Sequence, residues 1–212
     1  MIRKLCYAPA ILFLACAAAA GQIAPVENLR TTSPPSPATS YQPITGRQRF
    51  DWFVRSTVGG ESLAAGLFSA GLGTAINRPT EYGPHWDGFG KRYAMRLTGI
   101  STGNAIEAGL GSLWGEDPRY FPATGQPIKG RLKNVVLMTF AARQADGSLD
   151  PAYARYIGTV GNNFLSNSWR ADSESGVGDA CLRIALGFAG KMGGNAFAEF
   201  WPTARKHIFH RK

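Results

Sequence analysis

Two residues suited to acid–base chemistry lie close together on a short loop. His85 and Asp87 are two positions apart, on either side of Trp86, and Gly83 and Pro84 precede them. A histidine and a carboxylate can act as a base with its orienting partner, or can share a metal ion. Two ligands are too few for a metal centre. The simpler interpretation is therefore an aromatic loop residue with polar neighbours.

A second polar cluster follows the next long apolar stretch. Glu116 and Asp117 could form an acid–base pair, with Arg119 holding a substrate. Alternatively, Asp117 only shapes the turn that Asp-Pro favours, and Arg119 pairs with a carboxylate of the core. His85 and Asp87 acting with Glu116 or Asp117 would make the active site of a hydrolase.

No metal site and no cofactor is predicted. His207 and His210 share a helix face, but Arg205, Lys206 and other cations beside them would repel a divalent ion. The chain also lacks a Gly-Lys-Ser/Thr phosphate loop, a Gly-x-Ser-x-Gly elbow and a paired-cysteine metal motif.

A Gly-Asn pair occurs three times, each with an arginine upstream. The residues are Asn104, Asn162 and Asn195, with Arg96, Arg155 and Arg183. On a helix, Glu107 and Glu199 share a face with the nearest asparagine. If these faces point inward, the arginines are the natural partners of the glutamates, because burying an unpaired charge is prohibitive. We predict a buried polar network that fixes helix register, and a polar cavity is the alternative.

The elements that carry these residues read as helices. Apolar residues recur at three- and four-residue steps, and Ser62 to Ile76 contains no charge at all. The run from Leu132 to Arg143 is apolar nearly all round, and either a helix or a strand fits it. Asp150-Pro151 resembles an N-cap followed by proline at the first helical position. Helices are expected over residues 47–58, 62–76, 89–114, 132–143, 151–169 and 180–209.

Composition favours closely packed helices. The chain of 212 residues has 26 glycines and only 17% charged residues, with a hydrophobic fraction of 44%. Glycines four apart on a helix, such as Gly99 and Gly103, let another backbone approach. We predict an all-α fold over residues 46–212, a single bundle of about five to six closely packed Gly-containing helices.

The N-terminus has the pattern of a secretory signal peptide over residues 1–20. Arg3 and Lys4 precede an apolar stretch, and Ala18 and Ala20 suit the cleavage site. Cys16 could instead be the acylated first residue of a lipoprotein, a less favoured alternative. Residues 21–45 are rich in Pro and Ser, which predicts a disordered linker.

Three short motifs together resemble those of an uncharacterised family of bacterial secreted, Gly-rich helical proteins. The resemblance covers roughly residues 46 to 210 and implies export and an all-helical domain, but no activity and no catalytic residue. The motifs are Gly88-Phe89-Gly90-Lys91-Arg92-Tyr93, Glu116-Asp117-Pro118-Arg119-Tyr120-Phe121 and Phe200-Trp201-Pro202.

These features favour a protein of the periplasm or the envelope membrane. Removal of Arg3 and Lys4 would lower the formal net charge from +9 to about +7, and such a charge attracts anionic lipid surfaces. Self-association is a second possible partnership. A nucleic-acid partner is not expected for an exported chain without an aromatic–basic repeat. The function is predicted to be structural or lipid-interacting, with the periplasmic hydrolase as the alternative.

Overall fold

The computed structural model describes the backbone of residues 41–209 and the side chains of residues 41–205. The predicted signal peptide, Cys16 and most of the predicted linker lie outside these residues. So do the side chains of His207 and His210.

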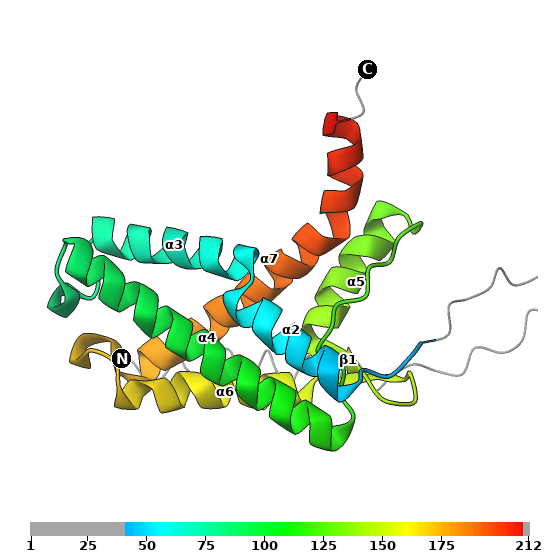
Figure 1. Cartoon of the computed structure of the whole chain (residues 1–212), viewed down its shortest axis with the longest axis horizontal. Helices are drawn as coiled ribbons and strands as arrows, with labels where there is room; N and C mark the ends of the chain where they lie inside the picture. Colours follow the sequence, from blue (N-terminus) through cyan, green and yellow to red (C-terminus); the bar gives the residue numbers. More distant parts are fainter. Residues whose placement is uncertain (1–40, 210–212) are drawn as a thin grey trace, which may run out of the picture.

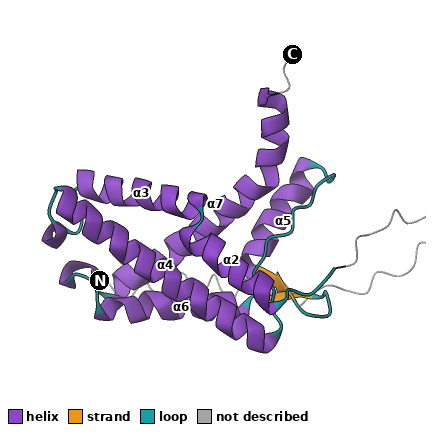
Figure 2. Cartoon of the chain, in the orientation of Figure 1, coloured by secondary structure: helices purple, strands orange, loops and turns teal. Residues whose placement is uncertain are grey.

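The described chain is helical apart from one small hairpin, which confirms the predicted all-α bundle (Figure 2). Short 3₁₀ turns follow α3 and α6. The main elements are α2 (Gly46–Val58), α3 (Gly60–Ala75), α4 (Trp86–Trp114), α5 (Ile128–Phe140), β1 (Ala141–Arg143), β2 (Leu149–Pro151), α6 (Tyr153–Leu165) and α7 (Val177–Phe209).

The long helix α4 organises the bundle (Figure 1). It packs against α2 and α3 and, most extensively, against α6. Helix α7 packs on α6 and α5. Its last turns, drawn in red, turn away from the bundle. Pro202 lies inside α7, where proline removes a backbone hydrogen bond and favours such a bend.

The hairpin corrects the expected helix over residues 132–143. Helix α5 ends at Phe140, and β1 then pairs antiparallel with β2, with Ala142 opposite Asp150. The turn between them contains Gly147 at φ +87°, a conformation that glycine adopts without strain. An apolar run of this length does not by itself distinguish a helix from a strand.

The expected start and end of α6 were also wrong. Asp150 and Pro151 belong to β2, and α6 begins at Tyr153. The backbone N–H of Ala154 donates instead to the Glu116 carboxylate, at 3.0 Å. Because the capping residue Glu116 is 38 positions from Ala154, the sequence around the start of α6 carries no capping motif. The helix ends at Leu165, before the predicted Trp169, and a 3₁₀ turn follows it.

The interior is unusually polar for a helical bundle. Among the described residues, the buried apolar side chains are alanines apart from Val135, Met138, Ile184 and Phe188. The largest fully buried side chains are those of Glu199, Thr139, Asp117 and Ser166. Large apolar side chains instead lie exposed on every helix. Within residues 41–209, no helix combines the length and apolar character needed to cross a bilayer.

Glycine allows a close backbone contact between α4 and α6. A Cβ built on Gly158 of α6 would lie 2.9 Å from the carbonyl oxygen of Gly103 on α4. Close helix packing at that point therefore excludes a side chain. By contrast, a Cβ at Gly109 would have nothing within 4 Å, although each helical glycine costs about 1 kcal/mol relative to alanine.

These two glycines should respond oppositely to alanine. Gly158→Ala should lower the free energy of unfolding by about 1–3 kcal/mol, because the methyl group meets backbone atoms that cannot rotate away. Gly109→Ala should raise it by up to about 1 kcal/mol. Urea unfolding followed by circular dichroism measures both, and equal effects of the two variants would contradict the α4–α6 packing.

Candidate functional site

A buried ion pair joins three helices. Arg155 Nε of α6 donates to Glu107 Oε1 of α4 at 2.9 Å, and both residues are buried. Arg155 Nη1 donates to the carbonyl oxygens of Met138 and Thr139 at 2.8 and 3.0 Å. The guanidinium therefore also accounts for carbonyls at the C-terminal end of α5. The N–H groups of Arg155 therefore donate to Glu107 and to the backbone of α5.

Glu199 of α7 is fully buried and forms a second ion pair. Its carboxylate accepts from Arg131 Nε at 2.8 Å, from the Ala123 backbone N–H at 3.0 Å and from the Tyr120 hydroxyl. Burial alone would raise the pKa of Glu199, but the hydrogen bonds from Tyr120, Arg131 and Ala123 together lower it. The carboxylate is therefore held as a charged acceptor.

The sequence identified Glu199 but not its partner. Arg131 provides the pairing, whereas Arg96 donates to the Ser62 carbonyl oxygen at 3.0 Å. Arg183 donates to the Glu174 and Asn163 carbonyl oxygens, at 2.7 and 3.1 Å. The predicted pairing of the glutamates with these upstream arginines holds only for Glu107 and Arg155.

The three asparagines do not meet at one point. Asn104 Nδ2 donates to Thr57 of α2 at 3.1 Å, and Asn195 Nδ2 donates to Thr139 of α5 at 3.0 Å. Asn162 lies against α4, where its Nδ2 is 3.4 Å from the Cβ position of Gly103. Each asparagine thus contacts a different helix.

Asp117 holds the start of the described chain. This buried carboxylate accepts from Arg119 Nη2 at 2.6 Å and from the Tyr41 hydroxyl at 3.1 Å. Burial and the Asp117 charge raise the pKa of Tyr41 to about 12. Arg119 Nη2 also donates to the Gln42 carbonyl oxygen at 3.2 Å. We call Tyr41, Asp117 and Arg119 the Tyr41 clamp, and its groups are engaged in structure.

Glu116 is buried at the N-terminus of α6. Burial raises the pKa of its carboxyl, and the Ala154 N–H and the Arg155 charge oppose this rise. The contact satisfies a backbone donor at a helix N-terminus, a position that favours negative charge. Capping explains the location of Glu116 without a catalytic role.

His85 and Asp87 lie at the other end of the molecule. Both are exposed at the N-terminus of α4, and Asp87 pairs with Lys91 at 3.8 Å. Glu116 and Asp117 follow the C-terminus of the same helix, whose 29 residues span about 43 Å. A general base must lie within hydrogen-bond reach of its partner, so the predicted hydrolase grouping is wrong.

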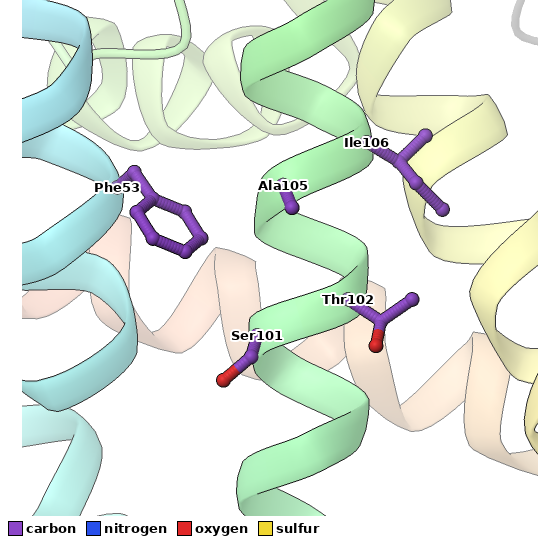
Figure 3. A pocket seen from close by; sticks show the side chains of 5 residues that line it. All are labelled: Phe53, Ser101, Thr102, Ala105 and Ile106. Carbon is purple, nitrogen blue, oxygen red and sulfur yellow. The ribbon is translucent and has the colours of Figure 1, made fainter.

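A shallow hollow between α2 and α4 contains none of the predicted site residues. Figure 3 shows Ser101 and Ala105 of α4 facing Phe53 of α2, while Thr102 and Ile106 point to the other side. The hydroxyl of Thr102 donates to the Thr98 carbonyl oxygen at 2.9 Å. No charged side chain lines the hollow. It therefore lacks the convergent polar groups of a small-molecule site.

Further cations of the interior were not identified in the sequence, among them Arg92 and Lys191. Arg92 is buried and donates to the carbonyl oxygens of Arg78, Gly83 and Pro79 at 2.7–2.8 Å, which fixes the loop between α3 and α4. Lys191 of α7 lies over the Trp52 ring, 5.3 Å from its centroid, and burial lowers its pKa to about 8. Among the described residues, no group of His, Cys, Asp and Glu side chains could hold a metal ion.

Comparison of the chain with protein-family models, with curated proteins and with solved structures found no match. The resemblance of its three motifs to secreted Gly-rich helical proteins stays a prediction. The geometry itself assigns the polar residues to helix packing, capping and loop fixation.

The Glu199–Arg131 pair gives a direct test of that assignment. Arg131→Met should lower the free energy of unfolding by about 3–5 kcal/mol at neutral pH, because it leaves a buried carboxylate without its partner. Arg78→Met, at an exposed arginine, should change it by less than about 0.5 kcal/mol. Urea unfolding measures both, and a small effect at Arg131 would contradict the structural role.

The pH dependence of stability should report on Glu199. Its pKa in the folded state lies below the ordinary value of 4.5, so its stabilisation is present above that pH and is lost as the pH falls through the folded-state pKa. The stability difference between the native chain and Glu199→Gln should therefore shrink in acid. A difference that stays constant from about pH 7 to about pH 3 would argue against a charged Glu199.

Proposed function

We propose that this is an exported, non-catalytic helical protein of the cell envelope that binds an anionic membrane surface through α3. The observation that carries the proposal is the outer face of α3. Leu67, Phe68, Leu72 and Ile76 are 52–73% exposed there, on a helix whose residues after Glu61 carry no charge.

Helix α3 holds this face outward because its other face is fixed to α4. A Cβ on Gly66 would meet the Tyr93 ring at 2.8 Å, and one on Gly73 would meet Arg92 at 3.1 Å. Ala70, between them, is buried. The inner face is thus occupied by packing, and the outer face remains for an apolar environment.

The surroundings of α3 suit the interface between lipid and water. Arg55 precedes the helix and Arg78 follows it, and both are exposed. Trp86 is 85% exposed, at the start of the helix to which α3 is joined by one loop. Tryptophan prefers the headgroup level of a membrane, and arginines near the surface add attraction to anionic lipid. A helix of this kind lies in the plane of the membrane.

The energy available is sufficient for reversible binding. Covering the exposed part of one such side chain stabilises the bound state by about 1 kcal/mol, so four give about 4 kcal/mol. Electrostatic attraction adds about 1 kcal/mol for each cation near an anionic surface. The sum corresponds to reversible association of a peripheral protein.

Sedimentation with vesicles tests the proposal. The chain should co-sediment with vesicles containing phosphatidylglycerol more than with pure phosphatidylcholine, and about 0.5 M salt should weaken binding by screening. Phe68→Glu/Leu72→Glu should reduce binding at least about tenfold, because charges on the apolar face must be desolvated.

The matched control is Leu165→Glu, at an equally exposed leucine at the end of α6. This variant should bind vesicles as the native chain does. If the native chain stays in the supernatant with both lipid compositions, or if only Leu165→Glu loses binding, α3 is not a membrane-binding helix.

A further inference from the structure

The outward face of α7 is uncharged from Leu182 to Trp201. From Leu182 to Trp201, no exposed residue carries a polar side chain. The exposed residues are Leu182, Ala185, Leu186, Gly187, Ala189, Gly190, Gly193, Gly194, Phe197, Ala198 and Trp201. The polar residues of this stretch, such as Asn195 and Glu199, are buried on the opposite face. A solvated helix would show the reverse distribution.

Among the described residues, nothing fills the space beside three glycines at the centre of this face. A Cβ at Gly190, Gly193 or Gly194 would have no atom within 4 Å, unlike Gly158, which is in close helix contact. Glycine lowers helix propensity at each position, and no contact of the described residues accounts for the choice. Glycine at four-residue spacing, as at Gly190 and Gly194, lets a second helix approach closely.

Side-chain size on this face is symmetric about the centre of the glycines. Reading outward from the centre in both directions gives glycine, then a small residue, then a large apolar residue, then alanine, and a large apolar residue at the end. A twofold axis perpendicular to the helix would pair Gly190 with Gly193, Leu186 with Phe197, and Leu182 with Trp201 of another copy. Such self-complementarity is what a symmetric dimer interface requires.

We propose that α7 pairs antiparallel with α7 of a second copy of this chain, with the crossing point between Gly190 and Gly193. The helices are then closest at the glycines, and the larger side chains fill the space where they diverge.

The features of the face favour a helix over other partners. Apart from the indole N–H of Trp201, it offers no charge and no hydrogen-bonding side chain, so a polar partner finds few groups to bind there. A lipid surface gains little from glycines, which expose the least apolar area. The pairing is independent of the proposed membrane binding through α3.

The paired face is smaller than a standard interface. It has about half of the 20–30 residues that each partner normally contributes. We therefore expect a reversible dimer with a dissociation constant of about 1–100 µM.

Alanine at the three glycines tests the close crossing. In Gly190→Ala/Gly193→Ala/Gly194→Ala, the methyl groups meet only the partner, so sedimentation velocity should show dimerisation at least about tenfold weaker. The same variant should unfold about 2–4 °C higher per glycine, because alanine favours the helix. A monomeric native chain at about 100 µM, or a variant that dimerises as well as the native chain, would overturn the proposal.

Disulfide crosslinking tests the antiparallel register. In a chain whose native cysteines are replaced by alanine, Leu186→Cys should crosslink to a second chain carrying Phe197→Cys. Each variant alone should not crosslink, since identical residues of the two copies would lie about 16 Å apart along the axis. Crosslinking of each variant with itself, or no crosslinking in the mixture, would exclude this pairing. The control is Leu72→Glu, on the outer face of α3. It should dimerise as the native chain does in sedimentation velocity.

Discussion

A buried charge can be accommodated only when an opposite charge and enough hydrogen bonds meet it, and this constraint determines how the helices of this protein are arranged. Glu107 and Arg155 hold α4 against α6, and Arg155 also reaches the end of α5. Glu199 and Arg131 hold α7 against α5. These pairs specify one relative position of the helices, since a shifted register would leave charges buried without partners.

The polar interior has a consequence for the surface. A chain with an ordinary hydrophobic fraction that buries glutamate, arginine and asparagine has fewer interior positions for its large apolar residues. Those residues lie outside on α3 and α7, as Phe68 and Leu186 illustrate. Large exposed apolar patches of this kind favour association with a membrane or with another protein. The two outward faces differ in their side chains. The face of α3 has large apolar side chains and is bordered by arginines, whereas the face of α7 has glycines at its centre.

Helical periodicity allowed the all-α fold and most helix positions to be predicted. The same periodicity put Glu107 on one helix face with Asn104 but left open whether that face points inward. Contacts between distant segments left no such trace. Arg131 is 68 positions from Glu199, and Glu116 caps a helix 38 positions away. The hairpin was missed because apolar residues continue without a break from α5 into β1. The predicted helix over residues 89–114 already separated His85 from Glu116, and the hydrolase alternative did not take the length of that helix into account.

The Tyr41 clamp determines where tension would enter the fold. The chain reaches α2 only after Tyr41 and Gln42 have been bound by Asp117 and Arg119. Asp117 is in turn joined to the hairpin through its backbone N–H, which donates to the Arg143 carbonyl oxygen at 2.8 Å. A pull on the N-terminal segment would therefore load the end of α4 and the hairpin together before α2 could unwind from its first turn. In mechanical terms, the clamp shields α2 from a force that is applied to the N-terminal segment.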